Sequence, residues 1–300
     1  MRIAICALLA GLLLTSGGRE APSSGPPSGP VTLALAGDLS LARGVAQANA
    51  TDWPATLRAV APPLRADLVA ANLESPLTDA PRRTPGIDLR APPGAAAALW
   101  PLTHLGVLNN HSRDAGPAGE VQSQGTLRRA GLTPVTSTQV VHVVRGQRIA
   151  LLAWLDDRAA PLPLSAVRAA ARQADTVIVL AHWGEEYGLT TARQRTQARA
   201  LVAAGATVIA GSGPHVLQGH EVLTGPRGAA LVLYSLGNLL FDQPFPAAQL
   251  GAVVRVPLPD VARACAAPTR TRAGRVTPAT GAQRTQALTR LGLPACPEVR

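Results

Sequence analysis

Side chains that bind divalent metal ions recur directly after apolar segments of this sequence. Asp38 follows the apolar residues 31–37, and Glu74 follows 68–72. Further along come Asn109, Asn110 and His111 after 105–108, His182 after 177–181, His215 after 208–213 and Asn238 after 231–237. Carboxylate, imidazole and amide groups suit a divalent transition metal, and there are more of them than one tetrahedral ion needs. Two ions about 4 Å apart, bridged by Glu74, would activate water and hold a phosphoryl group.

Each of these residues also has a purely structural interpretation. Asp38 fits a turn or a helix cap, Glu74 a solvated loop, and Asn110 the closing residue of a turn. His111 and His215 fit hydrogen-bonded structural histidines, and His182 could stack on its neighbour Trp183. His104 and His142 lie within apolar runs and are interpreted as structural. The repeated position after apolar runs therefore carries the metal hypothesis.

The elements that must position these residues alternate along the chain between buried strands and helices. The expected strands are 31–36, 67–71, 104–108, 140–144, 148–154, 176–181, 207–210, 230–236 and 252–256. Helix-like segments cover 55–61, 117–130, 164–173 and 191–204. This alternation predicts an α/β fold with a largely buried sheet. In such folds ligands bind outside the carboxyl ends of the strands, where the polar residues above are expected to meet. No GxSxG elbow, P-loop or GxGxxG motif is found.

Six motifs in this order resemble the CapA family, the bacterial capsule and poly-γ-glutamate synthesis proteins related to calcineurin-like metallophosphoesterases. They are residues 37–43 (GDLSLAR), 71–78 (ANLESPLT), 109–111 (NNH), 182–187 (HWGEEY), 214–219 (PHVLQG) and 234–238 (YSLGN). The resemblance covers residues 32–242. It implies an α/β fold built as a four-layer α/β/β/α sandwich of the metallophosphoesterase type.

The resemblance also implies roles for individual residues. Asp38, Glu74, Asn110, His182 and His215 match the metal site, which would take Mn, Zn or Fe as one or two ions, with Asp38 also part of the catalytic centre. His111 matches the histidine near the leaving-group oxygen and is the expected general acid. Arg43, Glu185 and Asn238 are weaker candidates for contacts to the substrate or to the metal ligands.

Two positions depart from the family pattern. Gly213 stands where the family usually carries the first histidine of His-Pro-His, and Ser40 replaces the histidine of the phosphoesterase DxH signature, a loss common in the family. Because glycine has no side chain to coordinate with, the second ion is expected to be weakly held or absent. His220 is a less favoured substitute for the missing ligand.

The two ends of the chain differ in character from its middle. Residues 1–20 carry a basic start, an apolar run and small residues, which is typical of a secretory signal peptide, with an uncleaved anchor as the alternative. Residues 21–30 are a Pro/Ser/Gly linker, residues 31–256 the CapA-like domain and residues 257–300 a basic tail. In an exported protein Cys265 and Cys296 are expected to form a disulfide, with two free thiols as the alternative.

Two functions from different classes remain open at this stage. The first is a metal-dependent, phosphoesterase-like hydrolase of the cell envelope that acts in capsule or poly-γ-glutamate production, within a membrane complex for capsule synthesis. The second is a catalytically degraded subunit that binds an anionic envelope polymer, as the net charge of +10 and Gly213 suggest. We expect no nucleic-acid partner, since the protein is expected to be exported to the periplasm or the cell surface and aromatic residues make up only 3% of the chain.

Overall fold

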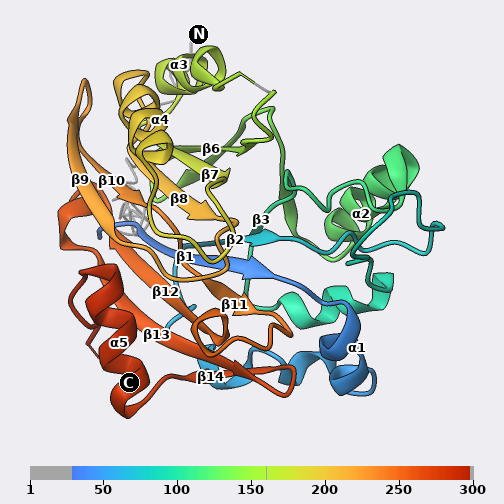
Figure 1. Cartoon of the computed structure of the whole chain (residues 1–300). Helices are drawn as coiled ribbons and strands as arrows, with labels where there is room; N and C mark the ends of the chain where they lie inside the picture. Colours follow the sequence, from blue (N-terminus) through green and yellow to red (C-terminus); the bar gives the residue numbers. More distant parts are fainter. Residues whose placement is uncertain (1–28, 160, 298–300) are drawn as a thin grey trace, which may run out of the picture.

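Two β-sheets stacked face to face form the centre of the protein (Figure 1). The computed structural model describes residues 29–159 and 161–297. The eight-stranded sheet has the order β14-β13-β12-β1-β2-β3-β4, with β11 paired to β1. Its strands are β1 (Thr32–Leu39), β2 (Leu68–Leu73), β3 (His104–Gly106), β4 (Thr133–Val135), β11 (Asn238–Leu240), β12 (Leu250–Pro257), β13 (Cys265–Arg272) and β14 (Arg275–Pro278).

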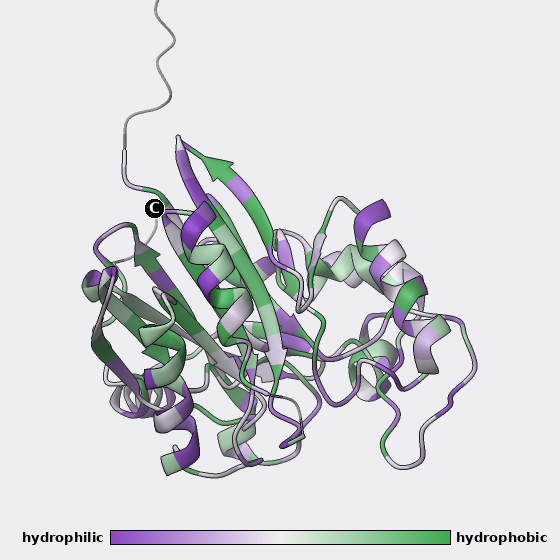
Figure 2. Cartoon of the chain, turned by 90° about the horizontal axis from the view of Figure 1, so that it is seen from above, coloured by the Kyte–Doolittle hydropathy of each residue, from purple (hydrophilic) through white to green (hydrophobic). Residues whose placement is uncertain are grey.

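The second sheet has six strands in the order β5-β6-β7-β8-β10-β9. These strands are β5 (Val140–Val144), β6 (Gln147–Leu155), β7 (Thr176–His182), β8 (Val208–Ser212), β9 (His220–Gly225) and β10 (Gly228–Leu233). Central strands such as β7 are buried along their whole length and consist mainly of Val, Ile, Leu and Ala. Figure 2 shows this hydrophobic character along the strands of both sheets. Strands covered on both faces require such continuous apolar runs.

Alternating side chains of each strand enter different apolar layers, as the two-residue period of a strand requires. On β1, Leu33 and Leu35 face the second sheet, whereas Ala34 faces outward. Helices α3 (Leu164–Gln173) and α4 (Ala192–Ala203) cover the outer face of the six-stranded sheet. Helices α1 (Arg43–Asn49) and α2 (Gly116–Arg129) cover the outer face of the eight-stranded sheet. The predicted four-layer α/β/β/α arrangement is therefore confirmed.

Parallel pairing brings the ends of distant strands to one edge of the molecule. In the first sheet β11, β1, β2, β3 and β4 are parallel neighbours in that order. Asp38 pairs with Asn72 on β2 and with Asn238 on β11. In the second sheet β6, β7, β8 and β10 are parallel neighbours, and His182 pairs with Ser212. The carboxyl ends of both parallel sets carry the polar residues that the sequence singled out.

The segment predicted as a basic tail is a structured part of the domain. Strands β13 and β14 extend the first sheet, and α5 (Gly281–Leu291) adds Ala287 and Leu291 to the core between the sheets. A disulfide joins Cys265 to Cys296. The expected boundary after residue 256 falls within β12, so the tail interpretation is corrected. The apolar pattern does not predict these strands, because β14 is the edge strand of the sheet, β13 is its neighbour, and both carry polar Arg and Thr residues.

Two further differences concern short segments. The helix expected over 55–61 is two 3₁₀ turns, η1 (Trp53–Ala55) and η2 (Arg58–Val60), with Pro54 in the first. The segments expected as a signal peptide (1–20) and as most of a linker (21–30) lie outside the described residues, apart from residues 29 and 30. Within 29–159 and 161–297, no helix has the length and apolar character that a membrane span requires.

Candidate metal centre

Glu74 is a buried carboxylate whose two oxygens have no hydrogen-bond partner among the described residues. Its side chain is only 1% exposed. The Nε2 atom of His182 lies 4.0 Å from Glu74 Oε1, and the Nε2 atom of His215 lies 3.8 Å from the same oxygen. Potential ligand atoms of Asp38, Glu74 and His215 all lie within 4.8 Å of one another. Four side chains from distant parts of the sequence thus converge on one point.

Both sheets contribute to this cluster through the ends of their parallel strands. Asp38 is the penultimate residue of β1, and Glu74 follows β2 directly. From the other sheet, His182 is the last residue of β7. His215 lies in the loop after β8 and has a positive φ of 57°, a backbone conformation that non-glycine residues rarely adopt.

Asp38 is held in place by two N–H donors. The Asn72 side-chain amide donates to Oδ1 at 2.8 Å, and the backbone N–H of Gly213 donates to Oδ2 at 2.9 Å. Burial by itself would raise the pKa of Asp38. The hydrogen bond to His215, the charges of both histidines and the Gly213 N–H outweigh it and lower this pKa. Asp38 is therefore an ionised carboxylate in a fixed orientation.

The two histidines are oriented through their Nδ1 atoms. Nδ1 of His215 lies 3.0 Å from Asn238 Oδ1 and 3.3 Å from Asp38 Oδ2, and Nδ1 of His182 lies 3.1 Å from Ser212 Oγ. Because His215 donates from Nδ1 to Asn238, it can present the lone pair of Nε2 to a metal ion, which is the usual arrangement of histidine ligands. Nδ1 of His182 also lies 3.2 Å from the side-chain amide nitrogen of Asn72. In both rings Nε2 is the nitrogen near Glu74.

The pKa values of the two histidines are displaced in opposite directions. Burial lowers the pKa of His182 to about 4, since the attraction of Asp38 only partly offsets it. Burial also acts to lower the pKa of His215. Its hydrogen bond to Asp38, the charges of Asp38 and Glu74, and the bond to Asn238 outweigh this and raise its pKa to about 10. Among the charged neighbours, Asp38 thus contributes most to stabilising the protonated form of His215.

The donor set fits a divalent metal ion. Burial, followed by the charge of Asp38, raises the pKa of Glu74 well above its usual range, because no donor compensates its negative charge. An unpaired buried carboxylate is costly, and a cation bound between carboxylate oxygens and imidazole nitrogens removes that cost. Asp38, Glu74, His182 and His215 are the residues that would hold the ion.

Asn109 and Asn110 have different environments although they are adjacent. Asn109 is buried, and its amide donates to Asn72 Oδ1 at 3.2 Å and to the carbonyl of Leu73 at 2.9 Å. Asn110, which the resemblance assigns to the metal, is exposed and lines a cavity of about 550 Å³. His182 and Gly213 line the same cavity, so it adjoins the metal cluster.

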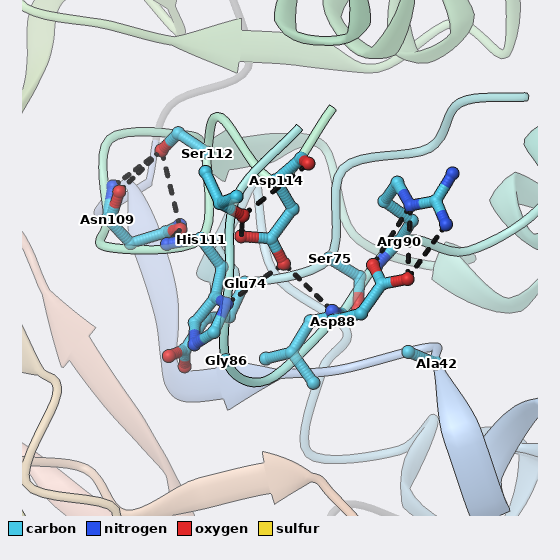
Figure 3. A network of polar contacts seen from close by, with 12 residues as sticks. Ala42, Glu74, Ser75, Gly86, Asp88, Arg90, Asn109, His111, Ser112 and Asp114 are labelled. Atoms are coloured by element: carbon cyan, nitrogen blue, oxygen red, sulfur yellow. Dashed lines mark hydrogen bonds and ion pairs between the residues drawn. The ribbon is translucent and has the colours of Figure 1, made fainter. Parts of the chain in front are cut away.

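His111 lies beside the cluster within a network of polar contacts (Figure 3). Its Nδ1 atom is 3.0 Å from Oδ2 of Asp114, a buried carboxylate that also accepts the backbone N–H of Leu89 at 2.8 Å. The charge of His111 contributes to the low pKa of His182, so the two imidazoles are close. Asp114 does not follow an apolar run directly and so is not among the predicted site residues, although its place three residues after His111 is a usable signal.

Comparison with known proteins agrees with this geometry. The family model of the bacterial capsule synthesis protein PGA_cap matches residues 32–243. The chain belongs to this family. It is 30% identical over 268 residues to the capsule biosynthesis protein CapA of Bacillus anthracis, covering 77% of this chain and 64% of that protein. It is 31% identical over 208 residues to the PGA biosynthesis protein CapA of Bacillus subtilis (strain 168), covering 59% and 54%.

This member of the PGA_cap family thus spans less than two thirds of the length of these curated relatives. Among solved structures it is similar to a hypothetical protein from Thermus thermophilus, with 20% identity, a TM-score of 0.45, and coverage of 83% of this chain and 98% of that one. It is also similar to a novel phosphatase from Mycoplasma pneumoniae, with 14% identity, a TM-score of 0.49, and coverage of 80% and 93%. At these scores neither structure bears on function.

In this PGA_cap protein, Gly213 occupies a position with little room for a side chain. Its φ is 106°, and an added Cβ would lie 2.8 Å from the carbonyl oxygen of Trp183. His220, the less favoured substitute ligand, begins β9, and its Nδ1 donates to the carbonyl of Leu291 at 2.7 Å. Among the described residues, one group of side chains could therefore hold a metal ion, and His220 does not supply a ligand for a second ion.

The three remaining candidates occupy different positions. Asn238 is buried, accepts from His215 and donates to the carbonyl of Ala248 at 2.8 Å. Arg43 forms an ion pair with Asp242 and places its guanidinium carbon 5.7 Å from the centre of the Phe241 ring. Glu185 is exposed and forms an ion pair with Arg158 at 3.2 Å.

Proposed function

We propose that this protein is a metal-dependent phosphoester hydrolase of the cell envelope that acts in the production of a capsule or of poly-γ-glutamate. One observation carries the proposal. The carboxylate of Glu74 is buried without a hydrogen-bond partner among the described residues, between two histidines that direct Nε2 toward it. Membership of the capsule synthesis family supports the biological setting.

Asp38, Glu74, His182 and His215 would hold the ion. When bound, a divalent ion acts as a Lewis acid on a phosphoryl oxygen and lowers the pKa of a water molecule. Asp38 stays ionised, because Asn72 and Gly213 donate to its oxygens. Asn238 accepts from Nδ1 of His215, and Ser212 and the Asn72 amide contact Nδ1 of His182, so that each Nε2 is directed inward.

His111 is the proton donor in this proposal. Asp114 accepts from Nδ1 and so fixes the tautomer and the orientation of the ring. With its Nδ1–H held by Asp114, the imidazolium form of His111 carries a second proton on Nε2, and it transfers this proton to the oxygen that leaves when the phosphoester bond breaks, which is the role of a general acid. The guanidinium group of Arg43, at the rim of the site, would attract the anionic phosphoryl group.

The location of the protein is part of the proposal. We propose that residues 1–20 direct export and that the protein works in the periplasm or at the cell surface, as an envelope polymer requires. Its substrate would be a phosphoester or an anionic polymer of the envelope, and its partners the other components of a membrane complex. The names of the relatives support the link to capsule and PGA synthesis.

Metal analysis followed by turnover measurements tests the proposed function. After Mn²⁺ or Zn²⁺ loading and removal of free metal, we expect about one ion per chain and hydrolysis of bis(p-nitrophenyl) phosphate. His215→Ala should lose the ion, whereas His111→Ala should keep the ion and lose turnover. His142→Ala, on edge strand β5, is the matched control and should keep both. Less than about 0.2 ions per chain would contradict the proposal.

The second candidate function is a non-catalytic subunit that binds an anionic polymer. The replacement of a usual ligand by Gly213 and the net charge of +10 favour it. This function predicts binding of polyglutamate that weakens steeply with salt and is unaffected by chelators. Polymer binding that requires the metal ion would exclude it, and turnover by metal-loaded protein would support the hydrolase instead.

A further inference from the structure

Two partly exposed aromatic rings lie at the rim of the metal centre and have no role in the proposal above. Tyr187 is 43% exposed and Phe245 is 53% exposed, and their ring centres are 5.1 Å apart. The Tyr187 ring is also 6.1 Å from the ring of His215, whose other neighbour is Phe241 at 5.1 Å. The aromatic contacts therefore continue from a metal-site histidine to the protein surface.

One loop holds this rim together. Residues 241–245 follow β11, and Asp242 in this loop forms an ion pair with Arg43 and accepts the backbone N–H of Gly44 at 3.0 Å. The next residue, Gln243, accepts a hydrogen bond from the Tyr187 hydroxyl at 3.0 Å. Arg43 follows β1 and Tyr187 follows β7, so the loop connects the ends of strands from both sheets across the site.

The backbone at both ends of this connection is strained. Arg43 has a φ of 50° and Tyr187 a φ of 60°, in the left-handed region that non-glycine residues rarely adopt. Such conformations persist where the surroundings hold them, and they are concentrated at ligand-binding positions. The backbone N–H of Tyr187 donates to the carbonyl of Pro214 at 2.7 Å, which fixes the ring beside His215.

We propose that Tyr187 and Phe245 determine the specificity of the site by stacking on a ring carried by the substrate, while Arg43 binds its anionic part. This inference rests on the proposed function. Aromatic faces left open to solvent beside a polar centre are suited to stacking on flat groups. We call the Tyr187–Phe245 pair the aromatic edge. The loop of residues 241–245 connects this pair to the guanidinium of Arg43. The substrate class is a phosphoester whose alcohol part carries a sugar or aryl ring.

Binding of two phosphonates to the metal-loaded full-length protein tests the inference without requiring turnover. We expect phenylphosphonate to bind about 3-fold to 10-fold more tightly than methylphosphonate in calorimetric titrations, the gain typical of one aromatic contact. Phe245→Ala should remove most of this preference and leave methylphosphonate binding within about 2-fold. Tyr187→Phe keeps the ring and should keep the preference. Val143→Ala, at a residue 71% exposed on edge strand β5, is the control for loss of an exposed apolar side chain.

A C-glycosyl phosphonate distinguishes the two sources of the ring. If its affinity also falls in Phe245→Ala, the aromatic edge accepts a sugar, whereas a loss confined to phenylphosphonate indicates an aryl group. Equal binding of phenyl- and methylphosphonate by the wild-type protein, or binding of neither, overturns the inference. The metal content and phosphodiester turnover of the same variants report separately on the proposed function. Intact turnover with no preference for a ring therefore contradicts the inference alone.

Discussion

Asp114 fixes the His111 imidazole at the edge of the metal cluster. The His111 Nδ1 and Asp114 Oδ2 atoms are 3.0 Å apart, and Asp114 is itself anchored by the backbone N–H of Leu89 at 2.8 Å (Figure 3). A carboxylate on one imidazole nitrogen sets which nitrogen carries the proton available for transfer. The pair therefore has the arrangement that a general acid requires.

Asp114→Asn tests this relationship. We expect kcat for a phosphodiester to fall on the order of 10²-fold, because the ring loses the acceptor that fixes its tautomer and orientation. KM and metal content should stay within about 2-fold of the wild type. Asp88→Asn is the matched control, since this carboxylate lies in the same region and pairs with Arg90 at 2.8 Å. Equal effects of the two substitutions would assign Asp114 a structural role only.

Glu74→Gln should separate the stability of the metal-free protein from metal binding. The substitution replaces a buried carboxyl group, whose oxygens have no hydrogen-bond partner among the described residues, by an amide that cannot ionise, so the metal-free variant should unfold at a higher temperature than the metal-free wild type at alkaline pH. A metal ion at about 100 times its Kd stabilises the wild type by about 2.7 kcal/mol, and this increment should be absent from the variant. Thermal unfolding with and without Mn²⁺ measures both effects. A full metal-dependent shift in Glu74→Gln would show that the ion binds elsewhere.

Metal affinity should rise with pH between about 6 and 9. The pKa of His215 is raised to about 10, mainly by Asp38, and burial raises the pKa of Glu74 well above its usual range. Both groups must lose protons before they can coordinate, so binding releases protons and is favoured at higher pH. Competition with a chromophoric chelator at fixed ionic strength gives the affinity at each pH. An affinity independent of pH over this interval would contradict the assignment of these two ligands.

The apolar pattern of the sequence was sufficient to predict an α/β fold and to place candidate residues near the cluster, and the resemblance to the CapA family implied the four-layer architecture. Asp38 lies at the end of β1, which is parallel to β2, and His182 ends β7, which is parallel to β8. Parallel pairing places the ends of such strands at one edge of their sheet. That rule needs only the order of apolar runs and the polar residue after each one. This rule does not predict how the two sheets face each other. Their relative placement puts Glu74 of the first sheet between His182 and His215 of the second.

What the sequence could not provide was the detail of hydrogen bonding. Asn109 and Asn110 are equivalent by position, yet only Asn109 turns inward and bonds to Asn72. Asn72 itself lay inside an apolar run and was not selected, although its amide orients Asp38. The apolar pattern does not predict β13 and β14, because Arg and Thr occupy half of each strand. Strand β13 is held by pairing with β12 and by the disulfide, and β14 pairs with β13.

Gly213→Ala tests whether this position has room for any side chain. The added Cβ would lie 2.8 Å from the Trp183 carbonyl oxygen and 3.1 Å from its nitrogen, at a φ of 106°. We expect a loss of about 2–4 kcal/mol in the free energy of unfolding, from overpacking together with an unfavourable φ. Gly86→Ala is the matched control, since Gly86 has a φ of 85° and nothing within 4 Å of an added Cβ. Chemical denaturation measures both variants, and equal losses would mean that φ alone accounts for the effect.

His104 makes the stability of the fold depend on pH. Its Nε2 is buried without a hydrogen-bond partner among the described residues, and burial, followed by the charge of His142, lowers its pKa from 6.5 to about 4. Because the unfolded chain binds the proton more readily, the contribution is fully present above pH 6.5 and is lost as the pH falls to about 4. The loss amounts to about 3 kcal/mol. Denaturant unfolding between about pH 4 and 7 should show a shallower pH dependence in His104→Leu than in the wild type. Identical slopes would mean that folding does not lower the pKa of His104.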